Sequence, residues 1–386
     1  MLNHPDALLN TFIQMSRKTV SSLISTPPHV HPTLTTLWSM RPEDQHYVPA
    51  GFLRSFRPDG EDALFVCRRR GKSWFRQVPE NIATRKNFYS VLRDDGTFDD
   101  RVEHILARRI ERPGLAALWK LKEGDVIPSL HSREAIALFL AVQYTRVPQI
   151  RENMHRLLEV VANEFTDEIL DEDFLPQRLQ ETESIDRKTA ERTARQLKGL
   201  VKAGHIRPVV KEEASMKMLF MAVEESAYGF IDMDWLVLVA DHPSFFTSDI
   251  PIYVSPAATT RKYVGIAAEG TVLHVPLSSR RFLLMGRRGG LRIHLAKLRE
   301  IAPKYFVDEL GRRPPVVKYR RATPELIETL NEGTAISAGD LVCGPHESER
   351  MAAALLKPRV KSDYHLQRVG GELKIDHRLV VEASRH

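Results

Sequence analysis

A histidine at position 46 is the side chain of this sequence best suited to acid–base chemistry. His46 lies in the stretch Gln45-His46-Tyr47-Val48-Pro49, whose neighbouring side chains are suited to burial. An imidazole titrates near neutrality, so with restricted solvent access it can act as a general base or a metal ligand. The alternative is a structural histidine that hydrogen-bonds to backbone. Pro49 holds the preceding residue extended, so His46 and Val48 are expected on the same face.

A carboxylate at position 249 is the second candidate. The strand-like stretch Phe245-Phe246-Thr247 leads through Ser248 and Asp249 into a turn at Pro251. A carboxylate at the end of a strand can serve as a metal ligand or a catalytic acid. Serine and aspartate before proline are also ordinary turn formers that bind local backbone amides. No Gly-x-Ser-x-Gly motif surrounds Ser248, so a serine nucleophile of that type has no support there.

Two polar residues at positions 143 and 146 accompany an apolar helical stripe. Gln143 lies on this stripe and Arg146 lies at its border. A buried amide and guanidinium need partners, which a carboxylate such as Asp249 or an anionic ligand would provide. An internal arginine–carboxylate pair that ties a helix to a sheet is the structural alternative. The stripe consists of Ile136, Phe139, Leu140 and Val147.

Basic residues interleave with aromatic ones between positions 68 and 89. This pattern is typical of a surface that binds phosphates and stacks on bases. The alternative is a solvated hairpin, because lysine and arginine on an exposed strand also discourage aggregation between sheets. The formal net charge of +6 indicates a partner only weakly. The basic residues are Arg68, Arg69, Arg70, Lys72, Arg76, Arg85 and Lys86, and the aromatic ones are Trp74, Phe75 and Tyr89.

The sequence lacks the motifs of several common binding sites, and it lacks an apolar run long enough to span a membrane. It contains no glycine-rich dinucleotide or Walker phosphate loop, no His-Glu-x-x-His zinc motif and no EF-hand loop. Cys67 and Cys343 are the only cysteines, too few for a disulfide framework, and are expected to be small core residues. The longest apolar runs fall far short of the roughly 20 residues that span a bilayer. We therefore expect a cytoplasmic protein without membrane contact.

Hydrophobic periodicity predicts the elements that must position these residues. The run Trp235–Ala240 is continuously apolar, as expected for a strand covered on both faces. Thr323 and Pro324 predict the N-cap and first position of a helix that continues to Ala338. Ser132 is an N-cap candidate. Further predictions are a hairpin (64–67 and 74–78), helices (102–118, 132–165 and 186–203), strands (271–275 and 281–285) and a turn over 276–279.

The order of these elements predicts an α+β fold, in which a mostly helical middle segment packs on a small, largely antiparallel sheet. The chain has 386 residues, of which 42% are apolar and 27% are charged, as in a globular protein with a sizeable core. We expect residues 1–40 to be an N-terminal extension with a helix (6–15) and a linker (21–36). Residues 41–350 are expected to form a single core domain, followed by a C-terminal segment, 351–386.

The stretch from Gln45 to Phe56 resembles the opening signature of a family known as domain of unknown function 4238. Ala50 and Gly51 depart from that pattern, and Ile250 replaces an asparagine that commonly follows the aspartate. The resemblance covers roughly residues 45–345 and implies no activity. Its further motifs are Asn81-Ile82-Ala83 with Lys86, Phe88 and Tyr89; Gln143 to Arg146 with Pro148; Thr247-Ser248-Asp249 with Pro251; Pro276-Leu277-Ser278 with Arg281; and Leu330-Asn331.

Two functions are compatible with these residues. The first is a hydrolase for a phosphate-containing substrate such as nucleic acid, with His46 as base or ligand and Asp249 as ligand or orienting carboxylate. Lys86 and Arg146 would stabilise charge, Gln143 would complete the site, and a divalent metal could serve as cofactor. The second is a non-catalytic nucleic-acid-binding protein in which these residues are structural. Convergence of His46, Gln143, Arg146 and Asp249 around an open pocket would favour the enzyme. Burial of all four without a cavity would favour the structural role.

Overall fold

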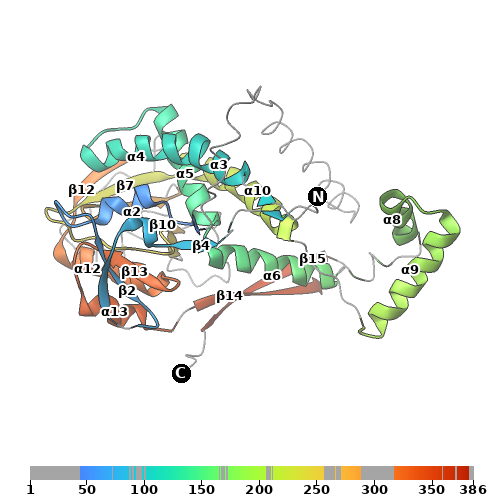
Figure 1. Cartoon of the computed structure of the whole chain (residues 1–386). Helices are drawn as coiled ribbons and strands as arrows, with labels where there is room; N and C mark the ends of the chain where they lie inside the picture. The colour runs from blue at the N-terminus through green and yellow to red at the C-terminus, as the bar shows by residue number, and fades with distance from the viewer. Residues whose placement is uncertain are drawn as a thin grey trace. The chain divides into compact units, whose positions relative to one another are not determined.

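The computed structural model of the chain describes most of its core (Figure 1). The chain divides into a unit of residues 1–44 and a unit of residues 45–386. The helix and linker predicted within residues 1–40 lie outside the described residues. Described are residues 44–71, 73–86, 88, 91–92, 98–99, 101–164, 166, 170, 173–205, 210, 212–255, 266, 271–287, 317–358, 360–369 and 372–381.

A five-stranded sheet forms the centre of the core. Its strand order is β12-β7-β11-β10-β9, and every neighbouring pair is antiparallel except β12 and β7. The predicted largely antiparallel sheet is therefore confirmed. The strands are β7 (Asp234–Val239), β9 (Tyr253–Ser255), β10 (Val272–Ser278), β11 (Arg281–Gly286) and β12 (Val317–Arg321).

Strand β7 explains why its sequence is apolar at nearly every position. Side chains alternate across a strand, so neighbouring residues face opposite sides of the sheet. Trp235 and Val237 belong to one buried cluster, whereas Leu236 and Leu238 belong to another. Both faces of the strand are therefore covered, as the unbroken apolar run predicts.

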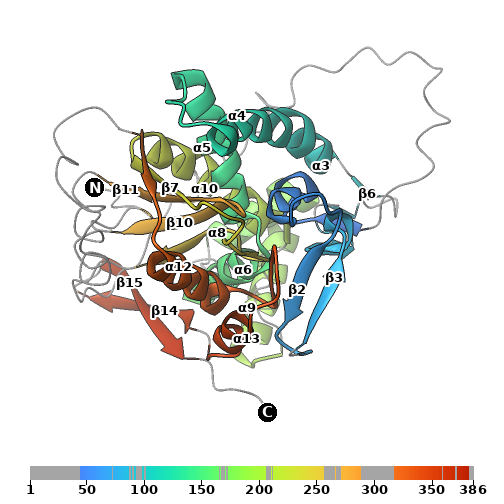
Figure 2. The same ribbon diagram turned by 90° about the vertical axis from the view of Figure 1, so that its left-hand side faces the viewer.

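Helices cover one face of this sheet. Helix α5 (Leu130–Thr145) packs against α4 (Arg112–Glu123) and α10 (Glu212–Ile231). Its residues Ile136 and Phe139 share a cluster with Trp235 of the sheet. Figures 1 and 2 show these helices together beside β7 and β10. The structure thus confirms an α+β fold with a helical middle segment packed on the sheet.

The opposite face is covered by α12 (Pro324–Ser337), which buries Leu326 and Leu330 against the sheet. The Thr323 side chain accepts a hydrogen bond from the Leu326 amide at 3.2 Å, so the predicted N-cap is confirmed. Helix α12 also packs on α13 (Glu349–Leu355), as Figure 2 shows.

A second sheet, of four strands, lies next to α12 and α13. Its order is β3-β2-β13-β8, and the antiparallel pair of β2 and β3 confirms the predicted hairpin. Cys67 and Cys343 are buried and free in this sheet, as expected. The strands are β2 (Leu64–Arg68), β3 (Trp74–Gln77), β8 (Thr247–Ser248) and β13 (Leu341–Gly344).

Three local predictions were wrong. The helix predicted over 132–165 is divided into α5 and α6 (Pro148–Glu164), because proline lacks an amide hydrogen and restricts the preceding residue. The N-cap of α5 is Ser129, whose hydroxyl accepts from the Ser132 amide at 3.2 Å. Strand β10 continues to Ser278, with a register shift between Pro276 and Ser278 that accommodates the proline, so the turn predicted over 276–279 lies at Ser279 and Arg280.

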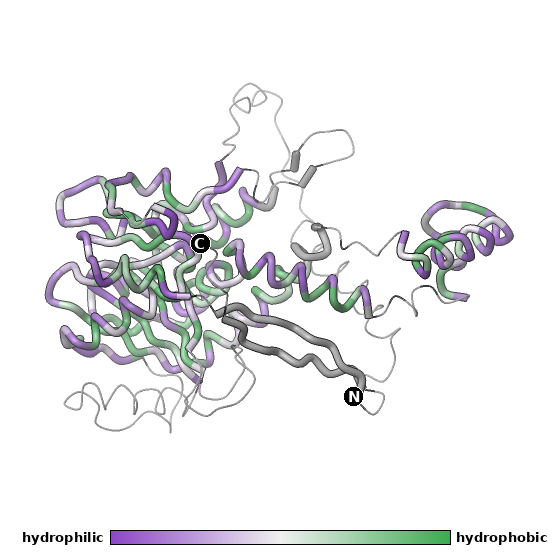
Figure 3. The backbone as a smooth tube through the Cα atoms, turned by 90° about the horizontal axis from the view of Figure 1, so that it is seen from below, coloured by the Kyte–Doolittle hydropathy of each residue, from purple (hydrophilic) through white to green (hydrophobic). Residues whose placement is uncertain are grey.

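The remaining elements are a pair of helices in the middle of the chain and four further strands. The helix predicted over 186–203 is confirmed as α9 (Arg187–Lys202), N-capped by Asp186, and it packs on α8 (Phe174–Glu183). Figure 3 shows hydrophilic and hydrophobic residues mixed along the coloured helices and strands, including α8 and α9. In the described part of the chain, no helix is long and apolar enough to cross a membrane. The others are β5 (Val91–Leu92), β6 (Phe98–Asp99), β14 (Val360–Val369) and β15 (Glu372–Val381).

Candidate functional site

A two-stranded sheet positions His46. The strands are β1 (Asp44–His46) and β4 (Thr84–Lys86), and the Tyr47 amide donates to the Ala83 carbonyl at 3.0 Å. Ala83 has a φ of 55°, in the left-handed region that costs an L-residue roughly 1–2 kcal/mol. His46 is half-buried, and the Lys86 side chain is exposed on the neighbouring strand. The sheet therefore brings the predicted base and one predicted cation onto adjacent strands.

The apolar continuation after His46 anchors this segment in the core. Val48 is fully buried, as are Phe52 and Leu53 of the short helix α2 (Ala50–Leu53). The ring of Phe52 lies 6.2 Å from that of Phe139 in α5. The histidine is thus held beside the helical layer by its own neighbours in sequence.

A helix of unusual geometry supplies a carboxylate to the site. Residues Leu106–Glu111 form a π-helical segment, η4, between α3 (Arg101–Ile105) and α4. Such segments are frequent at functional sites. The Arg146 Nη1 donates to Glu111 Oε1 at 2.5 Å, and the Glu111 side chain is 22% exposed. The carboxylate paired with Arg146 is therefore Glu111.

His46 lies close enough to Arg146 and Glu111 for their charges to affect its pKa. Burial lowers the pKa of His46 below its ordinary value, and the nearby positive charge of Arg146 lowers it further. Hydrogen bonding to the backbone of Pro79 and Glu80 raises this pKa, as does the charge of Glu111, but the net shift is downward. The imidazole is consequently neutral at pH 7. A neutral imidazole can accept a proton.

Gln143 and Arg146 carry polar atoms that no other described residue satisfies. Gln143 is 1% exposed, and both atoms of its amide lack a hydrogen-bond partner within the described residues. Arg146 is 5% exposed, and its Nε and Nη2 likewise have none there. A buried polar group left unsatisfied costs about 1–3 kcal/mol, so this pair is costly for stability alone.

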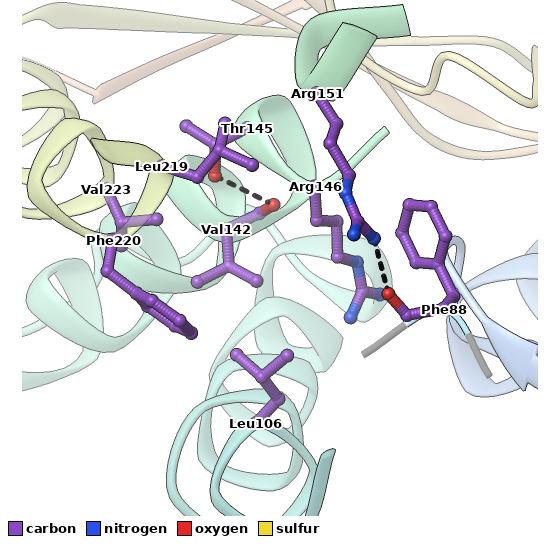
Figure 4. Close-up of a pocket in the computed structure, with 9 residues that line it drawn as sticks. All are labelled: Phe88, Leu106, Val142, Thr145, Arg146, Arg151, Leu219, Phe220 and Val223. Atoms are coloured by element: carbon purple, nitrogen blue, oxygen red, sulfur yellow. Dashed lines mark hydrogen bonds between the residues drawn. The ribbon is translucent and has the colours of Figure 1, made fainter. Parts of the chain in front are cut away.

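A small cavity of about 30 Å³ borders Arg146. Figure 4 shows the guanidinium of Arg146 between Leu106 and Arg151, with apolar side chains around it. Arg151 donates to the Phe88 carbonyl at 2.5 Å. A cavity of this size holds about one or two water molecules. The other lining residues are Val142, Thr145, Leu219, Phe220 and Val223.

Asp249 has a structural role. Its two carboxylate oxygens accept from the Gly339 amide at 2.7 Å and the Asp340 amide at 2.6 Å. Its own amide donates to the Leu341 carbonyl at 3.2 Å. A side chain on Gly339 would overlap the carboxylate, so glycine is required there. Asp249 therefore fixes the turn between α12 and β13, which is distant in sequence, and not the local turn at Pro251 that the structural alternative described. It also contributes to raising the pKa of Tyr47, after burial.

Three arginines of the β2–β3 hairpin, predicted to bind nucleic acid, form hydrogen bonds or ion pairs within the protein. Arg69 donates to the carbonyl oxygens of Ala338, Gly339 and Lys357 at 3.2, 3.3 and 3.0 Å. Arg68 donates to Asp340 at 3.4 Å, and Arg76 forms an ion pair with Glu61.

The other predicted nucleic-acid-binding residues of the hairpin are Arg70, Lys72 and Trp74. The ring of Trp74 packs 5.9 Å from that of Phe246. Arg70 is exposed, and Lys72 lies outside the described residues. Nucleic-acid binding by this hairpin stays a prediction.

Two acidic residues partner the polar side chains of this region, in roles that their sequence positions did not predict. Gln45 donates to Glu103 Oε2 at 2.7 Å, and Glu111 pairs with Arg146. A regular helix would not have predicted the direction of Glu111, because η4 changes the helical period. Across the residues that the structure describes, no three His, Cys, Asp or Glu side chains form a group that could hold a metal ion.

The fold and this cluster define an α+β protein with a buried polar site between a short strand pair and a helical layer. The chain belongs to the family described as "Protein of unknown function (DUF4238)", whose sequence pattern matches residues 44–346. The match includes His46, Gln143, Arg146 and Glu111, and it confirms the resemblance seen in the sequence. No curated protein and no solved structure matches the chain.

Proposed function

We propose that this protein is a hydrolase that acts on a phosphate-containing substrate. His46 would act as the general base, and Gln143 and Arg146 would donate hydrogen bonds to the phosphoryl oxygens. One observation carries the proposal: buried donors of Gln143 and Arg146 lack acceptors among the described residues, and Arg146 lies close enough to His46 for its charge to lower the pKa of the imidazole. Such donors fit an acceptor that arrives with a ligand.

The chemistry of the donors favours an oxyanion. Arginine has only donors, and its planar fork binds phosphate through two parallel hydrogen bonds. Glu111 uses Nη1 of Arg146 and leaves Nε and Nη2 for a ligand. The Gln143 amide adds a neutral donor, and Lys86 of β4 adds positive charge at an exposed position. Together they would stabilise negative charge that develops on the phosphoryl group.

The reaction follows from these positions. Neutral His46 takes a proton from water as the water oxygen attacks phosphorus. The bond from phosphorus to the leaving oxygen breaks, and that oxygen takes a proton from the imidazolium or from solvent. The amide of Gln143 and the guanidinium of Arg146 bind the non-bridging oxygens throughout. Asp249 takes no part in this scheme, because its oxygens are held by the amides of Gly339 and Asp340.

The exposure of the site residues favours a substrate with a terminal phosphate group. The cavity behind Arg146 has room only for water, whereas Glu111 and part of the His46 residue are exposed, with His46 Nε2 itself buried. A substrate would therefore enter from the side of β1 and η4. Because Gln143 and Arg146 are so deeply buried, a terminal phosphate fits better than the continuous backbone of a nucleic acid. A phosphorylated nucleotide or oligonucleotide end is the substrate that we propose.

The experiment measures hydrolysis of chromogenic phosphomonoesters and diesters, nucleotides, and 5′- or 3′-phosphorylated RNA and DNA. His46→Asn should lower kcat by at least about 100-fold, the usual contribution of a general base, while His242→Asn, an exposed control, should not. The kcat/KM of the wild type should rise with pH through a pKa below 6.5 and then stay level. Hydrolysis that His46→Asn leaves unchanged would contradict the proposal. Binding of RNA or DNA without turnover would support the non-catalytic alternative.

A further inference from the structure

A serine and a lysine outside the His46 cluster are in direct contact. Lys122 Nζ donates to Ser55 Oγ at 2.5 Å. Ser55 lies in the 3-10 segment η2 (Arg54–Phe56), and Lys122 lies in the last turn of α4. Both residues are half-buried, so the pair lies at the edge of the core. A nucleophile and a base within hydrogen-bond reach are the first requirement of nucleophilic catalysis.

The surrounding structure holds this pair in place. The Ser55 carbonyl accepts from the Ser279 amide at 2.9 Å, which ties η2 to the connection between β10 and β11. Phe52 and Phe56, on either side of Ser55 in sequence, are fully buried with ring centres 5.5 Å apart. The Lys122 Nζ lies 5.3 Å from the centre of the Phe52 ring. The lysine is thus packed against an aromatic ring of the same buried segment that carries Ser55.

The environment also prepares the lysine to act as a base. Its neighbours in α4, Leu118 and Leu121, are buried in the main core. Burial lowers the pKa of Lys122 to about 7, and the charge of Glu123 opposes this change. A substantial fraction of the amine is therefore neutral at pH 7. Only the neutral amine can accept the hydroxyl proton of Ser55.

We propose that Ser55 and Lys122 form a nucleophile–base pair that attacks the carbonyl carbon of a small ester or thioester. Lys122 takes the Ser55 proton as Oγ bonds to the carbonyl carbon. The bond to the leaving oxygen or sulfur breaks, and that atom takes the proton from Lys122. Water then hydrolyses the acyl-serine to release a carboxylic acid and restore Ser55. Pairs of serine and lysine perform this chemistry on unrelated folds. The site shares no residue with the His46 cluster, and its test is independent.

The test uses an alkyl fluorophosphonate, which labels activated serine hydroxyls, on the full-length protein followed by peptide mapping. The wild type should carry one adduct, on Ser55, and Ser55→Ala should carry none. Lys122→Arg keeps the charge and a donor but cannot accept a proton, so labelling should fall at least tenfold. Ser132→Ala, a change in another half-buried serine, should label like the wild type. The melting temperature of each variant verifies its folding.

Absence of a Ser55 adduct in the wild type would overturn the proposal, and so would equal labelling of Lys122→Arg. A second measurement needs no variant. Wild-type protein treated with p-nitrophenyl acetate should carry a transient acetyl group on Ser55. An acetyl group on Lys122 instead would show that the amine is the nucleophile, and would also overturn the assignment.

Discussion

Replacing Gln143 with leucine should make the protein more stable. Both polar atoms of this buried amide lack a partner among the described residues, and an unsatisfied buried group costs about 1–3 kcal/mol. Leucine has a similar volume and no polar atoms, so the substitution creates neither a large cavity nor strong overlap. We therefore expect Gln143→Leu to raise the free energy of unfolding by about 1–2 kcal/mol.

Gln45 provides a matched control. It is also a glutamine and is 0% exposed, but its Nε2 donates to Glu103 at 2.7 Å. Gln45→Leu removes the donor from a carboxylate, and a hydrogen bond to a charged group contributes roughly 1.5–3 kcal/mol. This variant should be less stable than the wild type by about that amount. Opposite signs for the two substitutions would show that the lack of a partner sets the stability cost at position 143.

Equilibrium unfolding in urea, followed by circular dichroism, measures both effects. A second series adds inorganic phosphate, which should stabilise the wild type by about 1.4 kcal/mol at ten times its dissociation constant. Gln143→Leu should respond less, because it lacks one donor for the anion. If Gln143→Leu were less stable than the wild type by 1 kcal/mol or more, the amide would already have partners, and the reasoning for the site would fail.

The other predictions concern the structural contacts and one titrating group. Asp249→Ala should destabilise the protein by about 2–4 kcal/mol in urea unfolding, because two backbone amides lose a charged acceptor. Gly339→Ala should also destabilise it, since the new methyl group overlaps that carboxylate; an unchanged midpoint would contradict this packing. Arg69→Ala should lower the melting temperature more than Arg70→Ala, because only Arg69 has known carbonyl acceptors among the described residues. The folded pKa of Lys122 lies below its unfolded value, so the unfolded chain binds more protons between pH 7 and about 10. Wild-type stability should therefore rise with pH over that range relative to Lys122→Met, and parallel pH profiles would refute the low pKa.

Local signals predicted the elements that local physics determines. The continuous apolar run of β7 and the Thr323 cap of α12 each depend only on residues adjacent in sequence. Both elements lie where these signals predicted them. The division of the helix at Pro148 was also visible in the sequence. The apolar periodicity continues on both sides of this proline, so the pattern was interpreted as one helix.

The composition of the site depended on contacts between distant residues. The apolar stripe of α5 correctly predicted that Gln143 would be buried, but it could not identify Glu111 as the partner of Arg146. That contact requires the π-helical segment, whose hydrogen-bond pattern has no clear sequence signal. The role of Asp249 was set by the turn at Gly339, ninety residues away in the chain. No local sequence pattern could predict the partner of Arg146 or the role of Asp249.

The pairing of β2 with β13 has a consequence for synthesis in the cell. Val66 pairs with Cys343, so the first hairpin of the core depends on a strand that the ribosome makes 277 residues later. At 5–20 residues per second, that strand follows after roughly 14–55 s. Until then β2 presents an open edge with apolar side chains, which is a site for aggregation. Nascent chains that stop before β13 should therefore depend on chaperones, and completion of this sheet should be one of the last steps of folding.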